Sequence, residues 1–249
     1  MLSSVPLRNR MLGILYYVVV ALGAVILAPV YGIVFCNFFR DVKKLNNVAH
    51  LFFVPMFKMF GIRLRVDGSE NIPRDRGFVI IANHQSFLDI NCIFAGVAPS
   101  AFLAKEDLWK IPLFRRMLDL SGSIPVHRGA SRGNVAIGAR LKERTDKGYV
   151  FSVFPEGRRS ENGALLPFKN GIFHMAKEHR YTLLPITILN TGRILPKSAT
   201  ALFPGELKII IHPPVEPSGY ETMTFESLRD QVRATILSAL PAGAKAKEA

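Results

Sequence analysis

The chain of 249 residues is long enough for one sizeable domain with an appendage, and its formal net charge is +13. That charge favours an anionic partner such as nucleic acid, acidic lipid or a phosphorylated substrate, although a solvated surface tuned for solubility also gives it. Two cysteines, Cys36 and Cys92, are too few for a disulfide framework, and no Cys/His cluster has the spacing of zinc ligands.

The N-terminal region contains a long apolar run. Residues 11–35 carry no charge, and this length exceeds the ~20 residues that cross a ~30 Å hydrocarbon core. A cleaved signal peptide has a shorter apolar centre of about 7–15 residues. We therefore expect an uncleaved transmembrane anchor, although residues 21–28 leave cleavage open. Basic residues flank the run and leave its orientation undecided: Arg8, Arg10, Arg40, Lys43 and Lys44.

A second apolar stretch, residues 48–62, is interrupted by Pro55 and Lys58. It is too short for a confident span. Two interpretations remain, an interfacial helix packed beside the first one and a core helix of the following domain. We assign residues 1–62 to N-terminal membrane-anchoring helices.

After Gly61, short β-branched runs alternate with longer amphipathic ones. The strands predicted are Arg63–Val66, Phe78–Ala82, Ala101–Ala104, Gly122–Val126, Val150–Phe154, Leu183–Leu189 and Lys208–His212. The helices predicted are Ser86–Phe94, Asp107–Leu120, Ser131–Lys147, Gly171–His179 and Phe225–Leu240. This alternation predicts a three-layer α/β domain with a largely parallel sheet over residues 63–241, followed by a disordered tail at 242–249.

Polar side chains follow three of the predicted strands. His84 comes just after Phe78–Ala82, and Arg128 and Glu156 come just after two others. Ligand sites of open α/β sheets collect beyond the carboxyl ends of strands. We therefore expect these three side chains at one edge of the sheet.

His84 and Asp89 form a candidate catalytic dyad. If a helix begins at Ser86, His84 lies in the preceding loop, and the carboxylate can orient its imidazole as a general base. An equally supported interpretation makes Ser86 the N-cap and Asp89 its capping-box partner. The two roles are compatible, since an acid in the first helical turn is favourable. Ser86 as a nucleophile is less favoured, because it lacks a glycine-flanked elbow.

The segment Phe154–Ser160 can hold an anion. Arg158 and Arg159 offer forked donors that suit phosphate oxygens, and Glu156 can accept a hydrogen bond from a substrate hydroxyl or hold an arginine. A surface turn with solvated charges is the alternative. Lys169, before a predicted helix, and Lys105, after a predicted strand, are further candidate cations.

Together these segments resemble the glycerolipid acyltransferase family, in particular 1-acylglycerol-3-phosphate (lysophosphatidic acid) acyltransferases. The resemblance covers roughly residues 66–215 and is carried by four ordered blocks: Asn83–Asp89, Gly122–Arg128, Phe154–Ser160 and Leu184–Ile186. The ordered set favours the dyad over the capping interpretation. The family usually has threonine where this chain has Arg158, a departure that bears on the acceptor loop.

The resemblance implies transfer of an acyl group from acyl-ACP or acyl-CoA to the sn-2 hydroxyl of 1-acylglycerol-3-phosphate, giving phosphatidic acid. It implies no metal and no cofactor beyond the donor. The roles that it implies are a general base with its orienter (His84, Asp89), phosphate binding (Arg128, Arg159), an acceptor-site loop (Glu156, Gly157, Arg158) and an oxyanion contact (Lys105). The catalytic domain is expected on the cytoplasmic face of a bacterial inner membrane.

Three other functions stay open from the sequence. One is acyl transfer to another acceptor, such as glycerol-3-phosphate, another lysophospholipid or an amino-lipid. A second is lipid hydrolysis, with water in place of the alcohol. The third is nucleic-acid binding, which the charge permits but which no interleaved aromatic–basic motif supports.

Overall fold

The computed structural model describes residues 5–30, 52–111, 115, 118–119, 121–126, 134–197 and 200–244. The α-helices are α1 (Leu7–Val30), a helix at residues 52–59, α4 (Leu88–Gly96), α6 (Asn134–Asp146), α7 (Gly171–His179), α8 (Thr191–Ile194) and α9 (Phe225–Ser238). The strands are β1 (Ile62–Asp67), β2 (Val79–Ala82), β3 (Ala101–Lys105), β4 (Ile124–Val126), β5 (Phe151–Val153), β6 (Leu183–Leu189) and β7 (Gly205–Ile211).

The seven strands form one sheet in the order β1-β7-β6-β2-β5-β3-β4. The β6–β7 pair is antiparallel, and every other neighbouring pair is parallel. The prediction of an α/β domain with a largely parallel sheet is confirmed. β2 lies in the middle with all four residues buried, which explains its uninterrupted apolar sequence.

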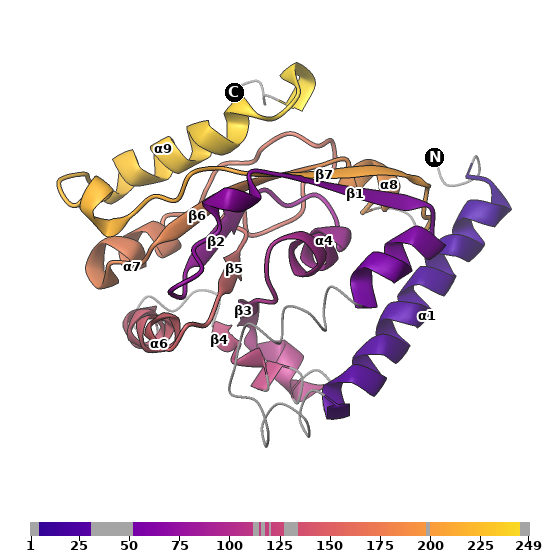
Figure 1. The fold of residues 1–249 in the computed structure, drawn as a ribbon, viewed down its shortest axis with the longest axis horizontal. Coiled ribbons are helices and arrows are strands. Elements are labelled where there is room, and N and C mark those ends of the chain that lie inside the picture. The colour runs from indigo at the N-terminus through magenta and orange to yellow at the C-terminus, as the bar shows by residue number, and fades with distance from the viewer. Residues whose placement is uncertain are drawn as a thin grey trace.

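Helices cover both faces of the sheet (Figure 1). Side chains of β2 alternate between two apolar clusters. Ile80 and Ala82 pack with α1, α4 and the helix at 52–59, whereas Val79 and Ile81 pack with α6, α7 and α9. The domain therefore has three layers. The carboxyl end of β2 opens between a layer that contains α1 and a layer that contains α7 and α9.

Helix α1 is attached to the domain along one side. Tyr16 is fully buried, and its hydroxyl accepts a hydrogen bond of 2.5 Å from the Asn91 side chain of α4. Asn9 exchanges hydrogen bonds with the backbone of Leu202. Gly13 lies so close to the backbone at Thr200 that an added methyl group would clash there. The sequence did not reveal this attachment, because an anchor expected in lipid needs no protein partner.

The other side of α1 presents apolar side chains to the surroundings. Its large exposed apolar residues are Leu7, Met11, Ile14, Leu15, Val18 and Leu22. Their spacing of three, four and seven residues places them on one stripe. No helix within the described ranges is both long and apolar enough to cross a membrane. The predicted run at residues 11–35 continues beyond Val30 into undescribed residues, so the spanning anchor stays a prediction.

The helix at residues 52–59 packs on the domain, as the core-helix interpretation of its segment expects. Met56 and Phe57 are buried in the core, with Phe60 just beyond the helix end, whereas Met59 is 60% exposed. The segment therefore packs on the domain with one face and leaves the other face free. The predicted helix Asp107–Leu120 begins as a 3-10 turn, Glu106–Lys110, and is only partly described beyond it.

Candidate active site

His84 lies in the loop between β2 and α4, beyond the carboxyl end of the strand. Its Nδ1 atom is 2.7 Å from Oδ2 of Asp89 in the first turn of α4. The Asp89 side chain is fully buried, and the His84 side chain is 17% exposed. A proton on Nδ1 that donates to the carboxylate leaves Nε2 as an acceptor. The pair thus has the arrangement of a general base with its orienting acid.

Asp89 also closes the start of the helix. Its Oδ2 atom accepts the backbone N–H groups of Gln85 at 2.7 Å and Ser86 at 2.8 Å. The Ser86 hydroxyl accepts the N–H of Leu88 at 3.2 Å. Asp89 reaches back to the N–H of Ser86 as in a capping box, but the Ser86 hydroxyl binds the N–H of Leu88 and not that of Asp89. The helix begins at Leu88 with Phe87 as its N-cap, so the predicted start at Ser86 is two residues early. A single oxygen of Asp89 holds both the imidazole and the backbone before the helix. Oδ1 of Asp89 is buried without a partner among the described residues.

Ser86 is poorly placed for nucleophilic attack. The residue is fully buried, and its hydroxyl donates a 2.6 Å hydrogen bond to the carbonyl of Leu195. A serine nucleophile needs a base within reach and an exposed oxygen. The hydroxyl here joins the α4 start to the end of α8.

Two side chains fix the loop that carries His84. Asn83 is buried, and its amide donates to the carbonyl and accepts from the N–H of Ile188 on β6, at 2.9 and 2.8 Å. Glu156 is 4% exposed. Its Oε1 accepts the N–H of His84 at 2.6 Å, and its Oε2 accepts the N–H of Leu166 at 2.9 Å. Because both oxygens bind backbone, Glu156 acts here by positioning His84.

Burial raises the pKa of Glu156 to about 7. The two backbone N–H groups and the charge of Arg233 oppose this rise, while Asp89 adds to it. Loss of hydration therefore outweighs the hydrogen bonds. Because Glu156 is bonded to the backbone of the candidate base, we expect this loop to respond to pH near neutrality.

The loop after β5 packs directly on the imidazole. Phe154 stacks on the His84 ring with centroids 4.0 Å apart and an interplanar angle of 18°. The N–H of Ser160 donates to the carbonyl of His84 at 2.8 Å. Phe154 and Asn83 were not among the predicted site residues. The signal available for Asn83 was a polar residue directly after an apolar strand.

The predicted cations of this loop differ in setting. Gly157 has φ +68°, a conformation that favours glycine, and Arg158 after it is exposed. Arg159 is partly buried on the side of α1, where burial raises the pKa of Tyr17 and the charge of Arg159 partly opposes this rise. Tyr17 packs near Phe87, with ring centroids 6.0 Å apart. Helix α1 thus contributes Tyr17 to the surroundings of Arg159.

Two predicted site residues are not placed with the others. Arg128 lies outside the described residues. The backbone of Lys105 ends β3, next to β4, but its side chain is not described. Their predicted roles therefore stay predictions.

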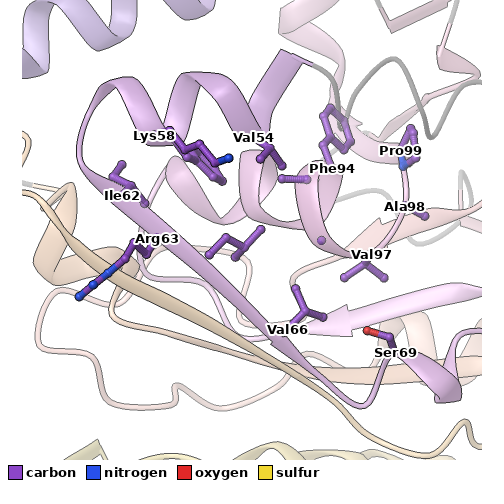
Figure 2. A pocket seen from close by; sticks show the side chains of 14 residues that line it. Val54, Lys58, Ile62, Arg63, Val66, Ser69, Phe94, Val97, Ala98 and Pro99 are labelled. Atoms are coloured by element: carbon purple, nitrogen blue, oxygen red, sulfur yellow. The ribbon is translucent and has the colours of Figure 1, made fainter.

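A groove of about 670 Å³ lies along α4 at the end away from the dyad. Figure 2 shows Val54, Ile62, Val66, Phe94 and Val97 around it, with Lys58 beside Val54 and Arg63 pointing away. None of the predicted site residues lines this groove. It is separate from the His84 loop.

Comparison with known proteins identifies the family of the chain. Residues 63–189 match the family model described as Acyltransferase. The match covers His84, Asp89 and the loop after β5. The chain belongs to this acyltransferase family.

Particular relatives cover most of the chain. It is 29% identical over 232 residues to the chloroplast 1-acyl-sn-glycerol-3-phosphate acyltransferase LPAT1 of Arabidopsis thaliana, covering 90% of this chain and 64% of the plant protein. It is 33% identical over 181 residues to the 1-acyl-sn-glycerol-3-phosphate acyltransferase of Borreliella burgdorferi, covering 69% and 71% of the two chains. The crystal structure of the 1-acyl-sn-glycerophosphate acyltransferase PlsC of Thermotoga maritima superposes with a TM-score of 0.78 at 31% identity, covering 93% and 95% of the two chains.

Proposed function

We propose that the protein is a 1-acylglycerol-3-phosphate acyltransferase. It moves a fatty acyl group from acyl-ACP or acyl-CoA to the sn-2 hydroxyl of lysophosphatidic acid and produces phosphatidic acid. The single observation that carries this proposal is the buried Asp89 carboxylate 2.7 Å from Nδ1 of a partly exposed His84, within a chain that matches this family. The relatives named for this activity support the choice of acceptor.

The chemistry proposed is a direct displacement. Nε2 of His84 takes the proton of the acceptor hydroxyl while that oxygen attacks the thioester carbonyl carbon. The carbon–sulfur bond then breaks, and the imidazolium returns the proton to the departing thiolate. No acyl-enzyme is needed. This agrees with the buried and hydrogen-bonded state of Ser86.

The acceptor phosphate is assigned to guanidinium groups. Arg159 is our first choice, since it lies on the α1 side of the site, and Arg128 is the second. Gly157 and Arg158 shape the acceptor loop, and Lys105 steadies the oxyanion. No metal and no cofactor other than the donor is required by this scheme.

The apolar stripe of α1 suggests that the enzyme binds its lipid acceptor at a membrane surface. We propose that this stripe inserts into a lipid surface, so that the enzyme takes its acceptor from the membrane without moving it into water. The enzyme then works at the inner membrane with its catalytic domain in the cytoplasm, where both kinds of donor reside.

The test combines purified protein with lysophosphatidic acid and with acyl-ACP or acyl-CoA of one chain length, read by mass spectrometry. Phosphatidic acid formed with either donor supports the proposal. Glycerol-3-phosphate and other lysophospholipids in parallel reactions define the acceptor. Free fatty acid released without an acceptor would identify a hydrolase instead.

A further inference from the structure

Lys169 lies over the loop after β5, which packs on His84. Its backbone N–H donates to the carbonyl of Pro155 at 2.9 Å. A methyl group built on Gly157 would lie 2.7 Å from Nζ of Lys169, so the lysine side chain crosses directly above that glycine. The residue is exposed. A cation that the proposed mechanism does not use is thus held at the rim of the site.

Helix α9 brings two more cations to the same place. Arg229 donates from Nη1 to Oδ1 of Asn170 at 2.7 Å, next to Lys169 in the chain. Arg233 follows one turn later on the same helix, where its charge partly opposes the rise that burial gives to the pKa of Glu156. Side chains four residues apart on a helix are neighbours. Lys169, Arg229 and Arg233 therefore form one surface, which we call the α9 basic surface.

The charge of this surface is only partly neutralised. Arg229 pairs with Asp230 at 2.8 Å. Within the part of the chain that the structure describes, no ion pair involves Lys169 or Arg233. Lys169 is exposed and Arg233 is partly exposed. Cations that reach solvent without an ion-pair partner attract an anionic one.

The α9 basic surface and α1 belong to opposite layers of the domain (Figure 1). Arg159 and Tyr17 border the α1 side, where we place the lipid acceptor. A two-substrate transfer needs a second approach to His84 for the donor. The α7–α9 layer offers this approach on the side away from the apolar stripe of α1.

We propose that the α9 basic surface docks an acidic acyl carrier protein that delivers the acyl thioester to His84, an inference that rests on the proposed function. Its cations lie along one helix face and an adjoining open loop, so they suit carboxylates spread along an acidic helix. The phosphates of coenzyme A would instead call for donors that converge on each phosphate. Charges of this kind act mainly on encounter and specificity.

The test measures kcat/KM for acyl-ACP and for acyl-CoA of one chain length in the full chain, with lysophosphatidic acid as acceptor. The double variant Lys169→Glu with Arg233→Glu is expected to lower the ratio of kcat/KM for acyl-ACP to kcat/KM for acyl-CoA by about tenfold or more. Added salt should lower the wild-type value for acyl-ACP more steeply than that of the variant. Arg74→Glu, an exposed cation before β2 at the other edge of the sheet, is the matched control and should leave the ratio unchanged.

Several results would overturn the docking surface. They are a ratio within about twofold of wild type in a folded variant, an equal loss with both donors, a rise confined to the acceptor KM, and a wild-type enzyme that uses only acyl-CoA. If the double variant melts early, the single variants Lys169→Gln and Arg233→Gln decide by the same ratio. A wild-type enzyme that uses neither donor would instead defeat the proposed function, and the docking surface with it.

Discussion

Glu156 accepts the backbone N–H of His84 at 2.6 Å, although 72 positions separate the two residues in the chain. The bond ties the loop after β5 to the loop after β2. The other carboxylate oxygen of Glu156 accepts the backbone N–H of Leu166. The carboxyl group therefore fixes the backbone from which the imidazole projects.

Glu156→Gln should lower kcat by about tenfold or more, because an amide has one oxygen where the site needs two acceptors. One backbone N–H, of His84 or of Leu166, then faces an NH₂ group. Acyl-transfer kinetics and thermal unfolding measure the effect. Glu161→Gln, whose side chain is 78% exposed, is the control and should be neutral. Wild-type kcat in Glu156→Gln would show that the bond does not position His84.

The free energy of unfolding should depend on pH because Glu156 titrates with a different pKa in the folded and unfolded states. Its pKa is raised from 4.5 to about 7, so this group stabilises the fold fully below its unfolded pKa and loses that contribution as pH rises through the folded pKa. The difference between the folded and the unfolded pKa corresponds to about 3 kcal/mol in the free energy of unfolding. Denaturant unfolding of wild type and Glu156→Gln between pH 4.5 and pH 8 tests this. A difference between the two proteins that does not vary with pH would contradict the shift.

Asp89→Asn separates the charge of Asp89 from its hydrogen bonds. Asparagine can place its oxygen where Oδ2 now accepts three bonds, and its NH₂ group where Oδ1 has no partner among the described residues. The loop should persist, at a cost of about 1–3 kcal/mol for the unpaired amide. Without the carboxylate, the imidazolium loses its stabilising charge, and kcat should fall roughly 10²-fold. A near wild-type kcat in the folded variant would remove Asp89 from the mechanism.

Ile14→Lys combined with Val18→Lys should weaken binding to uncharged phosphatidylcholine vesicles by roughly tenfold or more, because it places two positive charges on the apolar stripe of α1. Both residues are exposed and lie away from the Tyr16 contact. Vesicle flotation measures the bound fraction. Ile111→Lys, another exposed apolar residue outside α1, is the matched control. Unchanged flotation of the double variant would reject the stripe as the membrane contact.

Much of the architecture follows from local patterns. The bounds of β6 and α7 agree with the prediction residue for residue, because β6 is a nearly continuous apolar run and α7 is an amphipathic segment. Other bounds shifted by one to three residues. The antiparallel pairing of β7 with β6 was not predicted, since pairing direction depends on contacts distant in the chain.

The part of the site that is formed by residues close in the chain was predictable. His84 and Asp89 are five residues apart, so a loop-then-helix pattern was enough to bring them together. The role of Glu156 depends on a bond across 72 positions, and that of Asn83 on bonds across 105. Burial decides what Glu156 does. From the sequence, Glu156 was a candidate for contact with a substrate hydroxyl, whereas in the structure both of its oxygens bind backbone N–H groups.

The most direct test of the account is acyl transfer by purified His84→Ala, compared with wild type at equal circular dichroism and thermal stability. Removal of a placed general base should lower kcat by about 10²–10⁴-fold while the protein stays folded. Retention of more than about a tenth of the wild-type rate would contradict the account.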